Sequence, residues 1–129
     1  MKRRKKILVV FDTPGPVSSH QDFSEEMETV DWETEECVVR ALKGIGYPFE
    51  ILGIYDETDI LKEKIGRFQP DVIFNLVESF RGQLAHDRDI ASFFNLQAIP
   101  FTGCGPTGMT LCKNKAVSKR ILRHHRIRV

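Results

Sequence analysis

Residues 6–11 read Lys-Ile-Leu-Val-Val-Phe, an almost continuous aliphatic run that ends at Asp12. Strands that are buried on both faces of a parallel sheet have such unbroken apolar runs, whereas half-exposed strands alternate. Residues 12–29, which follow, contain two prolines, one glycine and three serines. The stretch therefore predicts a central strand followed by a long loop, and a loop of that length is usually functional or disordered.

Beyond this strand, apolar runs and helical spacings alternate along the chain. A helix should begin near Asp31, whose side chain can cap it, and stop at Gly46. We expect further strands at Phe49–Tyr55, Asp71–Val77 and Ala98–Thr102, and helices at Glu57–Phe68, His86–Asn95 and about Thr107–His125. This order predicts an α/β fold with three layers, α/β/α, around a mostly parallel, Rossmann-like sheet of about four strands.

The composition fits one domain, with 129 residues of which 41% are hydrophobic and 29% charged. The apolar run at the N-terminus is far too short to span a membrane or to serve as a secretory signal, so we expect a cytoplasmic protein without a membrane partner. The three cysteines, Cys37, Cys104 and Cys112, cannot all pair, and we expect them to be reduced and partly buried.

Charge is distributed unevenly along the chain. Residues 2–6 hold five basic side chains and residues 113–128 hold seven, whereas the stretch between them holds seven basic and all eighteen acidic residues, a net charge of −11. No acid follows Asp89. A basic tail indicates a phosphate-bearing partner, either a nucleotide or a nucleic acid. Nucleic acid is the weaker interpretation because the basic ends lack interleaved aromatic residues.

Ligands of open parallel sheets bind beyond the carboxyl ends of the strands, so the loops after Phe11, Val77 and Thr102 are the candidates. The third loop contains a GxGxxG pattern, Gly103 to Gly108. The acidic residue that a dinucleotide site needs about 20 positions later is missing, so we interpret the pattern as a tight turn. The histidines show no metal-ligand spacing, and we expect no metal site.

Two further motifs suggest binding chemistry. Lys115 and Lys119 lie four residues apart, on one face of a predicted helix, where they could meet polyphosphate oxygens or could simply form a solvated surface. Glu78, just past a strand end, could hold a substrate ammonium group, or it could pair with Arg81 or cap a helix. Asn75 lies inside an apolar strand, where a buried amide needs partners, and could tie neighbouring loops together.

The order of the segments ILVVFD, DVIFNLVE, IPFTGCGP and NKAVSKRIL resembles the N-terminal half of D-alanine–D-alanine ligases and their relatives in the ATP-grasp superfamily. The resemblance runs from about Lys6 to Val129. It implies a pre-ATP-grasp domain at residues 1–112, followed by residues 113–129 as the start of the helix that leads into an ATP-grasp domain beyond the chain.

In this family ATP phosphorylates a carboxylate, and an amine then attacks the acyl phosphate. The resemblance implies that Lys115 contacts ATP phosphates, that Lys119 matches the second lysine of the motif, and that ATP and Mg²⁺ are bound mainly by the absent domain. It also implies an amino-acid or carboxylate substrate and a possible homodimer. The fragment alone should be inactive, and no catalytic residue is expected in it.

Two departures from the family pattern concern the substrate side. No residue securely matches the family's substrate-gripping glutamate after the first strand, and residues 77–82 replace its HGxxGEDG loop, so specificity for D-alanine stays open. The alternative function is a stand-alone, non-catalytic binding or dimerisation module.

Overall fold

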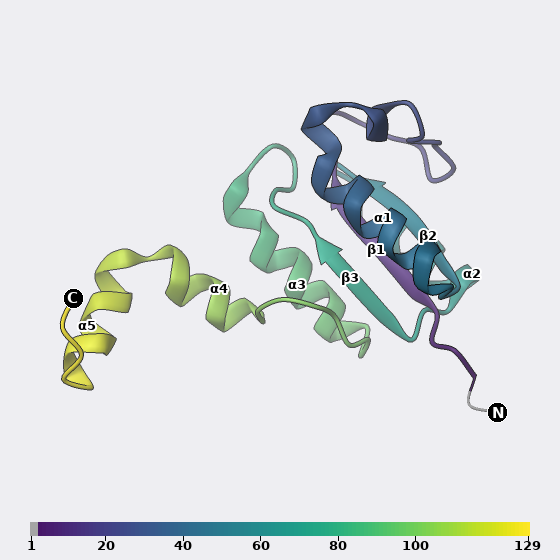
Figure 1. Ribbon diagram of the computed structural model, residues 1–129. Helices are drawn as coiled ribbons and strands as arrows, with labels where there is room; N and C mark the ends of the chain where they lie inside the picture. Colours follow the sequence, from purple (N-terminus) through teal and green to yellow (C-terminus); the bar gives the residue numbers. More distant parts are fainter. Residues whose placement is uncertain (1–2) are drawn as a thin grey trace.

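The computed structural model describes residues 3–129 and has the three layers that the sequence predicts (Figure 1). The elements are β1 (Ile7–Asp12), the 3-10 turns η1 (Glu26–Glu28) and η2 (Val30–Trp32), α1 (Glu33–Ile45), β2 (Phe49–Ile54), α2 (Asp59–Phe68), β3 (Val72–Leu76), η3 (Leu84–His86), α3 (Asp87–Leu96), α4 (Pro106–Lys113) and α5 (Lys115–His124).

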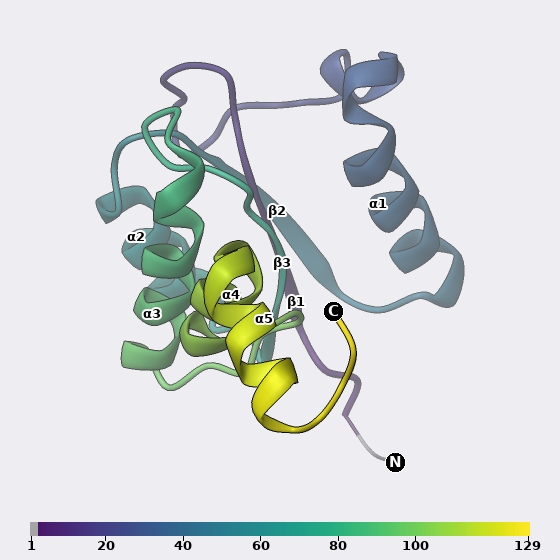
Figure 2. The same cartoon turned by 90° about the vertical axis from the view of Figure 1, so that its left-hand side faces the viewer.

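The sheet is parallel, with the order β2-β1-β3, and β1 is its central strand. Helix α1 covers one face, while α2 and α3 cover the other, as Figure 2 shows. Successive side chains of β1 point to opposite faces, so Leu8 and Val10 pack with α2 and α3, whereas Val9 and Phe11 pack on the side of α1. All four are fully buried, as the unbroken apolar run predicts.

The predicted sheet of about four strands has three, because the expected strand at residues 98–102 is reduced to one bridge between Ile73 and Phe101. Pro100 has no N–H to donate to a neighbouring strand, and Ala98 has a positive φ of 54°, which is not an extended conformation. Both residues therefore shorten the strand. Thr102 N–H still donates to the Ile73 carbonyl at 3.0 Å, which keeps this segment at the sheet edge.

Two predicted helix limits also differ from the structure. Asp31 does not cap α1, because a 3-10 turn occupies residues 30–32 and Trp32 takes the N-cap position without a side-chain hydrogen bond. The helix expected from Thr107 to His125 breaks at Asn114, whose ψ of 92° is not helical and whose side chain accepts a hydrogen bond from Val117 N–H. The stop at Gly46, with φ 70°, is confirmed.

The long loop after β1 is packed against the body. Phe23 is 3% exposed, and its ring meets Phe11 edge-on at 5.1 Å between centroids and stacks on Trp32 at 5.6 Å. Gly53 of β2 makes room for this ring, because a Cβ there would lie 2.6 Å from Phe23 Cζ. The loop therefore has a fixed course from the end of β1 to the start of α1.

The basic residues near the N-terminus form contacts at the end of the sheet where the strands begin. Arg3 pairs with Asp71 at 2.8 Å, Arg4 donates to the carbonyl of Ile45 at the end of α1, and Lys6 Nζ donates to the carbonyl of Phe68 at the end of α2. Cations at helix C-termini complement the helix dipole. These side chains thus have structural partners, which weakens the interpretation of the N-terminus as a nucleic-acid surface.

Candidate functional site

A cavity of about 670 Å³ lies at the carboxyl ends of the strands, where the sequence predicts a ligand site. Its wall combines the end of β1 and the loop after it, the start of α1, the residue after β2, and the end of β3 with its loop. The lining residues are Asp12, Thr13, Pro14, Asp31, Trp32, Thr34, Glu35, Tyr55, Asn75, Leu76, Val77, Glu78, Ser79 and Gly82.

The topology explains why the cavity forms there. After β1 the chain leaves toward α1 on one face of the sheet, and after β3 it leaves toward α3 on the other face. The two loops diverge at adjacent strand ends, which opens a crevice between them. Loops after β1 and β3 were two of the three that the sequence singles out, and the third, after Thr102, contributes no residue to the cavity wall.

Asp12 joins the two diverging loops. Its Oδ1 accepts a hydrogen bond from the backbone N–H of Glu78 at 2.7 Å, and its Oδ2 accepts one from the Ser79 hydroxyl at 2.6 Å. Hydrogen bonds to a carboxylate are about twice as strong as neutral ones. The end of β1 therefore fixes the backbone from which the Glu78 side chain projects.

The Asn75 side chain bonds within its own loop, and only the backbone N–H of this residue reaches a neighbouring segment, so the amide does not make the expected tie between loops. Its Oδ1 accepts from Val77 N–H at 3.1 Å, and its own N–H donates to the Thr102 hydroxyl at 3.0 Å. The amide is half-buried and lines the cavity. The side chain shapes the turn at the end of β3, and the backbone N–H connects this turn with the segment at Phe101 and Thr102.

Glu35 is an acid of the cavity wall whose pKa is raised above its ordinary value. Burial is the main cause that raises the pKa of this half-buried carboxyl group, and the negative charges of Asp12 and Glu78 raise it further, while a backbone hydrogen bond acts in the opposite direction. The three acids are therefore close enough to influence one another. A positively charged ligand group placed among them would relieve this repulsion.

Glu78 lines the cavity with an exposed side chain, and the ion pair with Arg81 that the sequence left open is not present among the described residues. Arg81 N–H donates to the Tyr55 carbonyl at 2.6 Å, and its Nε donates to the Asp56 carbonyl at 3.4 Å. Arg81 instead lines a separate, apolar pocket beside α3.

Lys115 and Lys119 lie on the first turns of α5, exposed and outside the cavity wall. Helices α4 and α5 extend away from the sheet on the side of α3 (Figure 1). The structure therefore does not bring the two lysines together with Glu78. It leaves them free of acidic partners within the described part of the chain.

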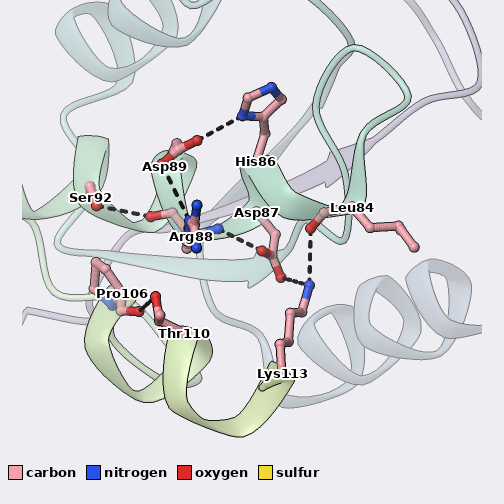
Figure 3. A network of polar contacts seen from close by, with 9 residues as sticks. All are labelled: Leu84, His86, Asp87, Arg88, Asp89, Ser92, Pro106, Thr110 and Lys113. Carbon is pink, nitrogen blue, oxygen red and sulfur yellow. Dashed lines mark hydrogen bonds and ion pairs between the residues drawn. The ribbon is translucent and has the colours of Figure 1, made fainter. Parts of the chain in front are cut away.

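Lys113 has a different role, which the sequence did not reveal. Its Nζ donates to Asp87 Oδ2 at 2.5 Å and to the Leu84 carbonyl at 3.0 Å, as Figure 3 shows. The Asp87 side chain is only 7% exposed, so its charge requires this partner. The contact fastens the end of α4 to the start of α3. Beyond the break, the Ser118 hydroxyl meets the Leu111 and Asn114 carbonyls and braces α5 against α4.

The glycine-rich segment forms a turn, with Gly103 at φ 92° and Gly105 at the N-cap of α4. The cysteines are all exposed, so the expectation of partial burial was wrong. Within residues 3–129, no group of three or more His, Cys, Asp or Glu side chains is arranged to hold a metal ion.

Sequence reasoning missed Asp12 and Glu35 as site residues. Asp12 had a detectable signal, because it is the first polar residue after a buried strand that ends at the ligand edge. Glu35 had none, since Glu33, Glu35 and Glu36 all suit the first turn of a helix and only the orientation of α1 turns one of them inward.

The fold and the cavity define a class, an α/β domain with a cavity at the switch point of its parallel sheet. The chain is similar to D-alanine–D-alanine ligases. It is 33% identical over 123 residues to that of Pelagibacter ubique, which covers 95% of this chain and 35% of the relative. It is 26% identical over 114 residues to that of Clostridium botulinum, covering 88% and 34%.

A shorter match, 36% identical over 55 residues, is to the vancomycin C-type resistance protein VanC2 of Enterococcus casseliflavus and covers 43% of this chain and 15% of the relative. No protein-family model matches, and no solved structure gives a significant match. The chain spans about a third of the length of the curated relatives that match most of it. These matches confirm the resemblance to the N-terminal domain of D-alanine–D-alanine ligase-like enzymes.

No helix among residues 3–129 has both the length and the apolar character that crossing a membrane requires.

Proposed function

We propose that this chain is the substrate-side domain of an ATP-dependent ligase that joins a carboxylate to an amine through an acyl phosphate. The observation that supports the proposal most strongly is the acidic cavity at the switch point, because an ammonium group is the substrate part that carboxylates such as Glu78 and Glu35 can hold. The similarity to D-alanine–D-alanine ligases supplies the reaction type.

In this proposal the two ends of the reaction lie in different places. Glu78 holds the amine in the cavity, while Lys115 and Lys119 face a nucleotide site that is completed, with its Mg²⁺, by an ATP-grasp domain outside this chain. The division into residues 1–112 and 113–129 follows from the same view. A cytoplasmic location fits a reaction that consumes ATP. The 129 residues alone would bind substrate without turning it over.

The exposure of the lysines is compatible with such a role. Both lie on α5, whose direction is set by the Asn114 cap, the Ser118 brace and the anchoring of α4 through Lys113. A lysine acts on phosphate as a point charge and does not need the planar geometry of arginine. A second domain that packs against α5 would therefore meet two positive charges in a fixed orientation.

The test is a calorimetric titration of magnesium-ATP into the 129-residue chain and into a longer protein that includes the downstream coding sequence. We expect only the longer protein to bind nucleotide, and Lys115→Ala to weaken that binding, whereas Lys43→Ala on α1 should not. Tight binding of nucleotide by the short chain would contradict the proposal and would direct attention to the turn at Gly103.

A stand-alone binding or dimerisation module is the second candidate, favoured by apolar side chains that α4, α5 and the tail leave exposed. These residues are Leu111, Ile121, Ile127 and Val129. Exposed apolar patches often mark protein–protein contacts. Sedimentation of the 129-residue chain would test self-association, which a monomer at high concentration would exclude. A homodimeric ligase could use the same surface.

A further inference from the structure

All charged residues that line the cavity are acids, namely Asp12, Asp31, Glu35 and Glu78. No lysine, arginine or histidine lies in the described wall. One carboxylate, or two, would suffice for a single ammonium group. Four acids without a cation therefore exceed what one amine requires.

The nearby cations do not line the cavity. Arg81 lines the other pocket, Lys115 and Lys119 lie outside the cavity wall, and the N-terminal basic residues occupy the opposite edge of the sheet. The hydrogen bonds that Asp12 accepts come from an amide and a hydroxyl group, which are neutral donors. The described wall thus holds acids and no cation, and burial together with the neighbouring acids raises the pKa of Glu35.

The arrangement of the acids suits an extended cation better than a point charge. No set of three of them converges on one position that could hold a metal ion. The volume of about 670 Å³ lies within the range of roughly 300–1,000 Å³ that is typical of pockets for organic ligands. A ligand with separated positive charges could reach several of the acids at once.

We propose that this cavity takes an amine substrate with at least two positive charges, a diamine or a basic amino acid, in place of D-alanine. This inference rests on the proposed function, which assigns the amine side to the cavity. A zwitterionic amino acid brings its own carboxylate among these acids, and like charges repel. A second ammonium group turns the same surroundings into an attraction.

The experiment is a titration of the 129-residue chain with 1,4-diaminobutane, 1-aminobutane, L-lysine and D-alanine at one fixed ionic strength, followed by calorimetry. The two butane amines have the same carbon skeleton and differ in one charge. We expect the diamine to bind about tenfold more tightly than the monoamine, the ratio that one added charge-assisted hydrogen bond supplies. L-lysine should bind more tightly than D-alanine.

Matched variants locate the effect. Glu78→Gln and Asp31→Asn should each weaken the diamine severalfold and reduce the ratio between the two butane amines. Glu63→Gln, which removes one exposed charge from α2 outside the cavity, should leave the ratio unchanged. Circular dichroism of each variant verifies the fold.

The outcomes separate the inference from the function on which it rests. If D-alanine binds as tightly as the diamine and responds to Glu78→Gln, the inference is wrong and the amine-binding function stands. If none of the four amines binds, both are overturned. If the diamine binds best but the Glu63→Gln control lowers its affinity as much as Glu78→Gln does, the ligand follows the overall charge of the protein and the inference is also wrong.

Discussion

The substitution Gly53→Ala tests whether the loop after β1 is held by the ring of Phe23. An alanine Cβ at position 53 would lie 2.6 Å from Phe23 Cζ and 2.7 Å from Thr13 Cγ2. Carbon atoms in ordinary van der Waals contact are about 3.5–4.0 Å apart. Phe23 is buried between Phe11 and Trp32, so its ring can yield only by moving the loop.

The expected cost follows from two ways of relieving the clash. Overpacking a core costs about 1–3 kcal/mol. Expelling Phe23 instead forfeits about 1.5–3 kcal/mol of burial, and a further 0.5–1.5 kcal/mol or so for each aromatic pair that the ring leaves. Alanine also reduces the conformational entropy of the unfolded chain, which stabilises the folded state by about 0.4–1 kcal/mol. We therefore expect Gly53→Ala to lower the free energy of unfolding by about 0.5–2.5 kcal/mol.

Urea denaturation, followed by the fluorescence of Trp32, measures this change. Gly66→Ala on α2 is the matched control, since nothing lies within 4 Å of its Cβ and alanine favours a helix. In a Phe23→Ala background the cost of Gly53→Ala should fall by at least about 1 kcal/mol, which a double-mutant cycle detects. An equal cost in both backgrounds would refute the clash with Phe23 as the cause.

Three other substitutions test the site and the tail. Asp12→Asn should cost about 1–3 kcal/mol, because an amide cannot accept both hydrogen bonds, and hydrogen exchange of the Glu78 amide should accelerate. Asn114→Ala removes the cap on Val117 N–H and should cost about 1 kcal/mol, with reduced helical circular dichroism. Glu35 has a folded-state pKa above its ordinary 4.5, so its protonated form stabilises the protein at low pH and this stabilisation is lost as pH rises through the raised pKa. Glu35→Gln should therefore gain stability relative to the parent protein between pH 4 and pH 7, and a constant difference across thermal melts in that range would contradict this.

The sequence predicts most of the fold because its strongest signals are local. The run at residues 7–11 has no plausible helical face, and Gly46 supplies a backbone conformation that other residues adopt with difficulty. The break at Asn114 was not predicted because lysine and leucine, which favour a helix, lie on both sides of it, although asparagine is a preferred N-cap residue.

The sequence predicts where the candidate site lies, but only some of the residues that form it. The switch-point rule selects the loops that form the cavity, and Glu78 lies in its wall. The predicted nucleotide role of Lys115 and Lys119 stays a prediction. Glu35 and the partner of Lys113 depend on how helices rotate and pack, which no local pattern encodes.

The packing of Phe23 also affects the thermodynamics of recognition. Ordering one residue costs about 1–2 kcal/mol of backbone entropy, and in many binding loops the ligand must supply it. Here the aromatic cluster keeps residues 13–32 in place before any ligand arrives. Association should then resemble the filling of a rigid receptor, with a small loss of chain entropy and with the free and bound proteins equally resistant to proteolysis in this segment.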